Sequence, residues 1–344
     1  MLLRSATAGA SAGAPLAADL ANLGISATAS LSPNVLIVGD GDLSYSLALR
    51  RCGCLPAGTR LCCTTLDSAA QLQARYPDTA EPNAVDLRSG GDVVWGGVDG
   101  TDLCTTMPAN ADAGTLRFSR VVWLFPHLCG KSKIHKHREL LCGFFASAAP
   151  RLVDDGEVWV ALTAGQGGTG AESVSPPRVW GDTWQVTECA ARAGLVLRVV
   201  HAADVALDTL AGEGYRCRGF HHSDRGFVRR GALVHVLGRP LPGRVVAWAK
   251  QWRHDISFWI DPAGFGDGNA FVALAVDVAE EAGGVAVAVA LVDEYAEPST
   301  GRVARTYSLR FTATWTALTK EEANELARRI KTKAQLMGME ARSY

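Results

Sequence analysis

The sequence predicts an α/β protein in two units: a doubly wound parallel sheet first, and a smaller α+β unit after it. An apolar strand at 35–38 runs directly into a Gly-Asp-Gly-Asp turn that opens a helix. Three further apolar runs, each ending in polar or turn residues, alternate with helical stretches, as in a parallel sheet. The last 93 residues, from 252 to 344, alternate in a different order and form the second unit.

The first turn contains Gly39, Asp40, Gly41 and Asp42. Glycines can take positive φ and let a ligand approach the backbone at the carboxyl end of a strand, where open α/β sheets place their sites. The turn lacks the third glycine of the dinucleotide fingerprint, and its acids would repel a pyrophosphate. They suit a ligand with positive charge and hydroxyl groups, such as S-adenosylmethionine.

The later strands also end in polar residues. The three runs occupy 61–66, 93–98 and 120–125. Asp67 ends the second strand about 25 residues after the glycine turn, the usual position of a carboxylate that binds ribose hydroxyls. Asp99 ends the third strand, and Pro126 and His127 follow the fourth. Because parallel strands end at one edge, we expect these residues to share a site.

The second unit shows the pattern of a βαββαβ split sandwich. The predicted segments are a strand at 255–260, a helix at 269–282, strands at 285–295 and 304–315, a helix from about 320, and a strand at 339–343. Val285, Val287, Val289 and Leu291 share one face of their strand. Thr319 and Glu322 have the spacing of a capping box, and Gly338 suits the position after the helix.

The first unit resembles the family of rRNA uridine N3 methyltransferase-like proteins. The motifs that carry the resemblance are VLIVGDGDLSYSLAL, CTTLDS, GVDGTDL, RVVWLFPH, RELLCGFFASAAPRL and GEVWVALTAGQ, within residues 34–240. The resemblance implies a Rossmann-like methyltransferase domain that binds S-adenosyl-L-methionine. It places the methionine-side loop at Gly39, Asp40, Gly41, Asp42 and Ser44, the ribose clamp at Asp67, and the adenine edge at Val98 and Asp99.

Two departures from the family pattern concern catalysis. Where the family has Asn-Phe-Pro-His, this chain has Leu124, Phe125, Pro126 and His127, and leucine lacks the acceptor that would hold the target nitrogen. The segment 165–169 lacks the family's Pro-Tyr, and with it an aromatic ring for stacking on a flipped base. The resemblance therefore implies a catalytic site at Leu124, Pro126 and His127, in which His127 is the candidate base.

The second unit resembles the ferredoxin-fold anticodon-binding domain of phenylalanyl-tRNA synthetases. The motifs are DISFWI, ALVDEY, RTYSLRF, WTALTKEEAN and GMEAR, and they span 252–344. In the synthetases this module holds the tRNA anticodon stem. Here the segment carries 10 basic and 13 acidic residues, a net charge of −3, which disfavours phosphate binding. The alternatives are that the second unit binds another protein or that it stabilises the first unit.

Basic residues gather in two other segments, 127–138 and 216–253. The candidate RNA-binding residues are Lys131, Lys133, Lys136, Arg138, Arg216 and Arg218. The whole chain has a net charge of only −1, so an RNA footprint has to be a local patch. The alternative is that these basic residues lie in loops where water solvates their charges.

The predicted organisation is a flexible tail or arginine-poor presequence at 1–32, a Rossmann-like domain at 33–240, a linker at 241–251 and the ferredoxin-like domain at 252–344. Nine cysteines without a C-x-x-C pair suggest a reduced, intracellular chain, in cytoplasm, nucleolus or mitochondrion. In this interpretation Cys52 and Cys54 are small apolar residues. The histidines lack zinc-finger spacing, so no metal site is expected. No DNA or membrane partner is expected either.

The sequence therefore favours an S-adenosylmethionine-dependent RNA methyltransferase, with a uridine N3 of rRNA as target. The first alternative is a non-catalytic RNA-binding or ribosome-assembly factor that keeps the fold, and Leu124 is the residue that raises it. The second is a tRNA-binding protein whose role comes from the second unit. rRNA is the favoured partner, and the oligomeric state is not predicted.

Overall fold

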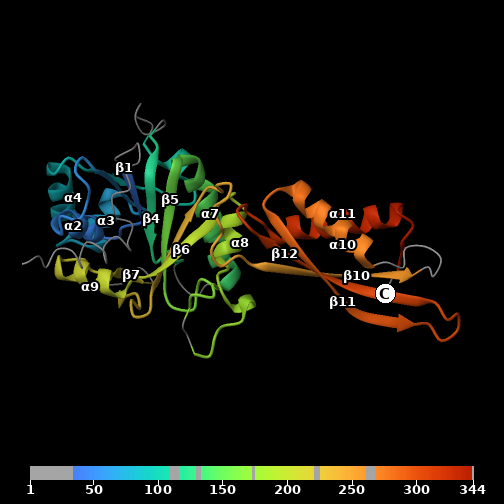
Figure 1. The fold of residues 1–344 in the computed structure, drawn as a ribbon. Coiled ribbons are helices and arrows are strands. Elements are labelled where there is room, and N and C mark those ends of the chain that lie inside the picture. Colours follow the sequence, from blue (N-terminus) through green and yellow to red (C-terminus); the bar gives the residue numbers. More distant parts are fainter. Residues whose placement is uncertain are drawn as a thin grey trace, which may run out of the picture.

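The computed structural model describes residues 34–108, 116–128, 133–172, 175–220, 225–260 and 268–342. Their helices and strands form two units that lie next to each other along the length of the molecule (Figure 1). The predicted tail at 1–32 lies outside the described residues.

The first unit is built on a seven-stranded sheet with the order β3-β2-β1-β4-β5-β9-β6. Its strands are β1 (Asn34–Val38), β2 (Arg60–Thr65), β3 (Val93–Gly96), β4 (Phe118–Leu124), β5 (Leu152–Leu162), β6 (Val196–Ala202) and β9 (Leu233–Gly238). The pairs from β3 to β5 are parallel, whereas β9 is antiparallel to both of its neighbours. The four predicted strands and their parallel pairing are confirmed, and the antiparallel strand is an addition.

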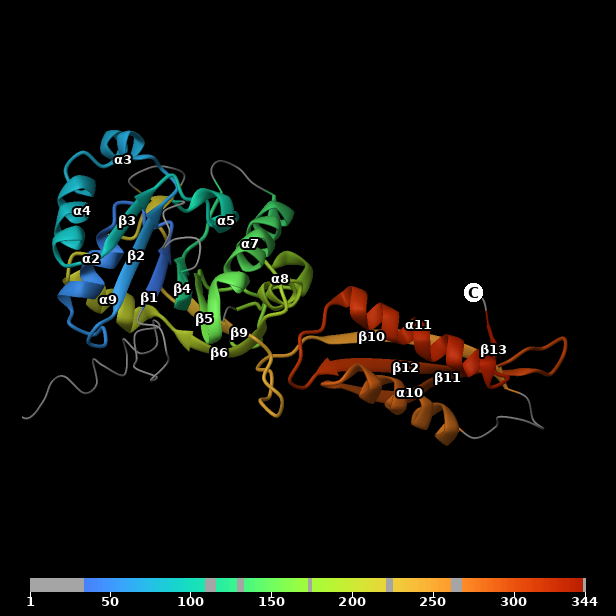
Figure 2. The ribbon, with the colours of Figure 1, turned by 90° about the horizontal axis from the view of Figure 1, so that it is seen from above.

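Helices cover both faces of this sheet (Figure 2). One face carries α2 (Ser44–Arg51), α3 (Ala69–Arg75), α4 (Ala80–Ser89) and α9 (Asp204–Gly212), and the other α5 (Leu103–Thr106), α7 (Ile134–Ala148) and α8 (Val186–Ala191). Val35 and Ile37 of β1 enter one core and Leu36 and Val38 the other, since side chains of a strand alternate. Shorter elements are η2 (Ala149–Arg151), η3 (Trp180–Asp182), β7 (Arg218–Phe220) and β8 (Arg225–Gly226).

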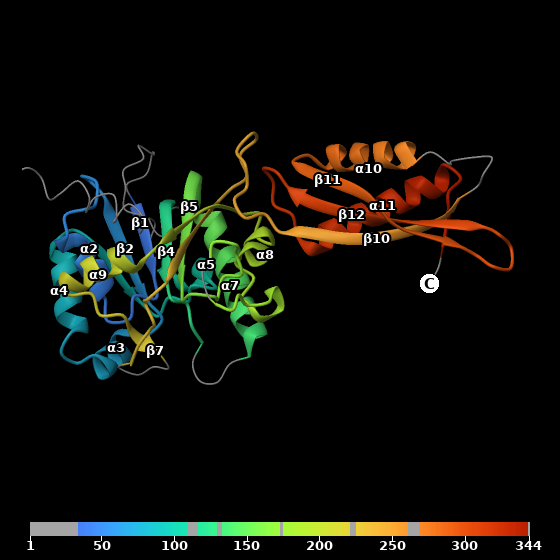
Figure 3. The same ribbon diagram turned by 60° about the horizontal axis from the view of Figure 1, so that its bottom comes forward.

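The second unit is a four-stranded antiparallel sheet with the order β11-β12-β10-β13. Its elements are β10 (Gln251–Ile260), α10 (Gly268–Ala282), β11 (Val285–Ala296), β12 (Val303–Ala313), α11 (Lys320–Leu336) and β13 (Glu340–Ala341). Both helices pack on one face of this sheet (Figure 3). Phe258 and Phe311 are fully buried on that face. The predicted ferredoxin-like order is confirmed, and β10 begins earlier than expected, at Gln251.

Local signals in the second unit are mostly confirmed. Thr319 and Glu322 form the capping box of α11, and Gly338 after the helix has φ +95°. Leu291 stays in register opposite Tyr307, on the same face as Val287 and Val289, as predicted. It is nevertheless 52% exposed, and a bulge follows it before Asp293. Among the described residues, no helix combines the length and the apolarity that crossing a bilayer requires.

The two units touch through α8 and the start of α11. Glu188 accepts a hydrogen bond from the backbone N–H of Lys320, and Arg192 pairs with Glu321 at 3.2 Å. The segment between the units is also held, since the N–H of Ala247 donates to the carbonyl of Leu197 in β6. These contacts join the units across the predicted linker, and the domain boundaries themselves stay a prediction.

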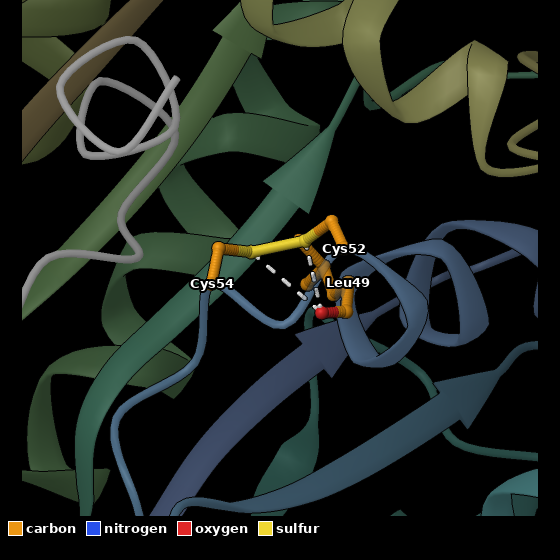
Figure 4. The surroundings of a disulfide bond; sticks show 3 residues. All are labelled: Leu49, Cys52 and Cys54. Carbon is orange, nitrogen blue, oxygen red and sulfur yellow. Dashed lines mark hydrogen bonds between the residues drawn. A yellow bond between two sulfur atoms is a disulfide. The ribbon is translucent and has the colours of Figure 1, made fainter. Parts of the chain in front are cut away.

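The expectation that Cys52 and Cys54 are reduced is wrong. The structure joins their sulfur atoms in a disulfide at the end of α2 (Figure 4). Gly53 has φ +64° and turns the chain, so that the two Cα atoms lie 5.4 Å apart, within the range that a disulfide spans. Both sulfurs lie near the carbonyl oxygen of Leu49, at 3.1 and 3.6 Å.

Candidate functional site

A cavity of about 160 Å³ lies at the carboxyl ends of β1, β2 and β4. It forms there because parallel strands end at one edge of the sheet and their following loops diverge. Nine of the predicted site residues line it: Gly39, Asp40, Gly41, Asp42, Asp67, Leu124, His127, Arg216 and Arg218. Sequence reasoning therefore located the cavity, and what each residue binds stays a prediction.

Asp40 is engaged with the start of α2. Its carboxylate accepts hydrogen bonds from the N–H groups of Tyr45 and Ser46, at 3.2 and 2.8 Å, and from the Ser46 hydroxyl at 2.5 Å. Burial outweighs these hydrogen bonds and raises the pKa of Asp40 to about 7. Asp40 thus shapes the cavity as the carboxylate that fixes the turn to its helix.

Asp42 and Ser44 hold neighbouring segments against the glycine turn. The Asp42 carboxylate accepts from the N–H of Ser44 at 3.1 Å and from the hydroxyl of Thr79 at 3.3 Å. The Ser44 hydroxyl accepts from the N–H of Arg216 at 3.0 Å. This bond spans 172 residues of sequence and explains why Arg216 and Arg218 lie at the cavity. Ser44 itself does not line the cavity.

Asp67 lies opposite the glycine turn and is paired with Arg75 of α3. The Asp67 Oδ2 to Arg75 Nη1 distance is 2.5 Å, and the Asp67 side chain is 14% exposed. Arg75 also lines the cavity and was not predicted from the sequence. The pair holds a charged acceptor in place at the end of β2, where the ribose clamp is expected.

Trp123 explains why Val98 and Asp99 do not line the cavity. A Cβ atom on Gly39 would lie 2.9 Å from the Trp123 indole nitrogen, and one on Gly100 would lie 3.3 Å from the same ring. The indole therefore fills the space between the two glycines. Val98 is buried behind it, and the Asp99 carboxylate accepts from the N–H and hydroxyl of Thr101 at 2.8 and 2.7 Å.

A second cavity, of about 200 Å³, adjoins the first through shared walls. Phe125, His127 and Phe227 line both cavities, and Pro126 and Gln166 line only the second. The rings of Phe125 and Phe227 stack with centroids 5.5 Å apart, and Phe125 has a left-handed φ of 51°, a strained conformation typical of functional sites.

Phe227 supplies an aromatic ring that sequence reasoning expected to be missing. It lies in the loop after β8, and its ring centroid is 5.8 Å from that of His127. The absent Pro-Tyr of segment 165–169 therefore does not leave the second cavity without an aromatic wall. No local pattern marks Phe227, because only the fold brings residues 125 and 227 together.

His127 belongs to a stack of rings. Its imidazole lies 4.9 Å from that of His137, and His137 lies flat on Trp184 at 4.3 Å. Burial lowers the pKa of His137. The rings of His137 and Trp184 thus pack beside His127, which lines both cavities.

Of the remaining predicted RNA-binding residues, those that the structure describes do not line the cavity. Lys131 is outside the described residues, and Lys133 precedes α7. Lys136 is exposed and pairs with Glu139 at 3.0 Å. Arg138 is different, because its guanidinium donates to the carbonyl oxygens of Thr183 and Gly181 and so holds a loop. For Arg138 the structure shows a structural role, and RNA binding stays a prediction for the others.

The comparisons with known proteins decide the family. Residues 36–217, more than half of the chain, match the model of the BMT5-like family, described as rRNA (uridine-N3-)-methyltransferase BTM5-like. The chain belongs to the BMT5-like family. The match covers the glycine turn, Asp67, His127 and Arg216, whereas Arg218 and Phe227, which also line the first cavity, lie beyond the matched range.

Two curated relatives are named for a ferredoxin-fold anticodon-binding domain. The human ferredoxin-fold anticodon-binding domain-containing protein 1 is 39% identical over 208 residues, which is 60% of this chain and 31% of that protein. Its mouse homologue is 36% identical over 213 residues, 62% of this chain and 32% of that protein. The matches span about a third of these relatives' length. Heavy metal-associated isoprenylated plant protein 41 of Arabidopsis thaliana is 35% identical over 133 residues, 37% of this chain and 24% of that protein.

Solved structures that resemble this chain are methyltransferases of low sequence identity. The CcbJ methyltransferase from Streptomyces caelestis is 16% identical, with a TM-score of 0.35, covering 65% of this chain and 93% of that chain. A TehB-like S-adenosylmethionine-dependent methyltransferase from Corynebacterium glutamicum is 14% identical, with a TM-score of 0.32, covering 65% and 86%. The first unit is a Rossmann-like methyltransferase domain of the BMT5-like family, and the second is ferredoxin-like.

Proposed function

We propose that this protein is an S-adenosylmethionine-dependent RNA methyltransferase whose target is a uridine N3 of rRNA. The observation that carries the proposal is the pair of cavities that meet at His127. One is built from the glycine turn and Asp67, as a cofactor site requires, and the other has aromatic walls suited to a base. Family membership supports the reaction class, and the choice of uridine and of rRNA over tRNA is our proposal.

The residues present fit the polar part of S-adenosylmethionine. Asp67 would hold the ribose hydroxyls, and the backbone of Gly41, with a φ of +28°, leaves space for the methionine part. Trp123 limits the space for the adenine, since its indole fills the gap beside Gly39. When bound, the cofactor supplies an electrophilic methyl group.

The chain's own residues would prepare the base. A flipped uracil would enter the second cavity and stack on Phe227, which excludes water from one face of the ring. His127, at the junction, would accept the proton of the N3–H group, and its stack with His137 holds the imidazole in place. A positioned base contributes about 10²–10⁴-fold to such a reaction.

A second candidate function is RNA binding without catalysis. Leu124 favours it, because it lines the cavity where the family pattern has an asparagine and offers no acceptor for the target nitrogen. The two candidates differ in one measurement. Purified protein that binds S-adenosylmethionine and RNA but transfers no methyl group supports the non-catalytic factor.

The test is methyl transfer from labelled S-adenosylmethionine to transcribed rRNA, with the product nucleoside identified by mass spectrometry. Formation of N3-methyluridine supports the proposal. Methyl transfer to tRNA alone would redirect it, and transfer to neither RNA would contradict it.

The cofactor assignment is tested by Asp67→Ala. Hydrogen bonds to a charged group contribute roughly 1.5–3 kcal/mol each, so we expect cofactor affinity to fall at least about tenfold in calorimetry. Asp86→Ala is the matched control, because Asp86 also pairs with an arginine, Arg51, at 3.2 Å, away from the cavity. Equal affinities for the two variants would remove Asp67 from the site.

A further inference from the structure

A third cavity, of about 510 Å³, lies where the first unit meets the segment that enters β10. The side chains that define its chemistry are Glu172, Arg178, Trp180, Trp248 and Lys250. It is separate from the site described above, although both use one loop. Gln166 lines the cavity beside His127, whereas Gly165 and Gly168 of the same loop line this one.

Glycines build the wall that receives Trp248. A Cβ atom on Gly170 would lie 2.9 Å from two carbons of the Trp248 ring, so the indole packs directly on the backbone there. Trp248 has a left-handed φ of 52° and is 50% exposed. An exposed indole held by a strained backbone conformation is unusual for a linker residue and indicates a role in contact.

The opposite wall combines aromatic rings with positive charge. The Lys250 ammonium lies 4.9 Å from the ring centroid of Trp180 and 5.8 Å from that of Trp252. Trp180 comes from the first unit and Trp252 from the second, and their rings meet edge to face at 6.4 Å. The wall is therefore set by the contact between the units, with Lys250 held at a fixed place.

Glu172 holds the glycine loop that forms part of this cavity. Its Oε1 accepts from the N–H of Gly168 at 2.7 Å, and its Oε2 is buried without a hydrogen-bond partner among the residues that the structure describes. Two indoles beside two cations suit a ligand that has a flat ring and carries a phosphate. A nucleotide has all of these features.

We propose that this cavity binds a nucleotide of single-stranded RNA that neighbours the target base. The base would stack on Trp248 and Trp180, and Lys250 and Arg178 would neutralise its phosphate. The inference rests on the proposed function, because the shared loop would let one RNA strand reach both cavities. In this inference the junction between the two units binds the RNA strand at a nucleotide next to the one that reacts.

The test measures binding without turnover. A labelled oligouridylate of about 12 nucleotides is titrated with the full chain, and fluorescence anisotropy gives the affinity. Trp248→Ala should weaken binding roughly 5- to 100-fold, because it removes a stacking surface. Trp248→Phe should restore most of the affinity. Leu336→Ala is the control, since Leu336 is 84% exposed on α11 and lies outside the cavity.

The outcomes separate this inference from the proposed function. Unchanged affinity for S-adenosylmethionine shows that Trp248→Ala is folded. If Trp248→Ala and Leu336→Ala bind the oligonucleotide equally well, the inference is overturned, whether or not the chain methylates RNA. If unlabelled uridine monophosphate competes as well as the unlabelled oligonucleotide does, the ligand is a small nucleotide, and the inference that this cavity binds an RNA strand is overturned. If wild-type protein transfers no methyl group, the comparison of oligonucleotide affinities still tests this inference.

Discussion

At the scale of single residues, Asp40 shows how a carboxylate near a ligand cavity can serve the fold. Its three hydrogen bonds fix the first turn of α2, and burial raises its pKa to about 7. Below about pH 4 the carboxyl is protonated in both the folded and the unfolded chain. Between about 4 and 7 only the folded chain keeps the proton, so a rise in pH favours unfolding across this window.

This sign gives a prediction. The free energy of unfolding should fall by roughly 1.4 kcal/mol per pH unit through Asp40 within the window and stay level above it. Asp40→Asn cannot ionise, so it should flatten this part of the profile in urea unfolding between pH 4 and 8. Asp86→Asn serves as control, because Asp86 is exposed. The same slope in wild type and Asp40→Asn would contradict the assignment.

Single residues also mark the limit of what the sequence could predict. Asp67 was found because a strand end and a count along the chain suffice to place it. Trp123 and Phe227 were not found, since their positions depend on packing between distant segments. Val98 and Asp99 were placed at the adenine edge without knowledge of the indole that fills that space. The sequence pattern locates the end of a strand, but the packing of distant segments decides which side chains line the cavity.

At the scale of elements, the strongest signals were those with a local cause. The polar ends of the first four strands and the capping box of α11 were both predicted and are both present. The antiparallel β9 was not predicted, because an apolar run in the sequence does not show whether its strand pairs parallel or antiparallel with its neighbours. The bulge in β11 was also missed, since it follows Leu291 and leaves the alternation of the preceding residues intact.

The capping box gives a prediction for α11. Thr319 accepts from the N–H of Glu322 at 3.1 Å, so Thr319→Ala leaves a helix-start N–H group without its partner. We expect the second unit to lose about 1 kcal/mol, seen as a lower midpoint in chemical denaturation. Thr332→Ala, at an exposed position within the same helix, is the matched control. An equal loss in both variants would show that the cap does not stabilise this helix.

At the scale of the whole molecule, the two units are coupled through a buried carboxylate. Glu188 is 7% exposed, and it accepts from the backbone N–H of Lys320, the first residue of α11, at 3.3 Å. A negative charge there complements the positive end of the helix dipole and satisfies an N–H that the helix leaves unpaired. The α8 helix of one unit thus helps to cap the last helix of the other.

Glu188→Gln should therefore loosen the contact between the units more than Glu321→Gln does. Glu188 is buried and accepts a hydrogen bond from a helix-start N–H, whereas Glu321, in the first turn of α11, is exposed and its pair with Arg192 is worth about 0–1 kcal/mol. In calorimetry the second unit should unfold at a lower temperature in Glu188→Gln, by the loss of about 1–2 kcal/mol, and its transition should separate from that of the first unit. Because the third cavity needs both units in place, the same variant should also bind oligouridylate less tightly. A single unchanged transition, with unchanged RNA affinity, would show that the units are joined by the linker alone.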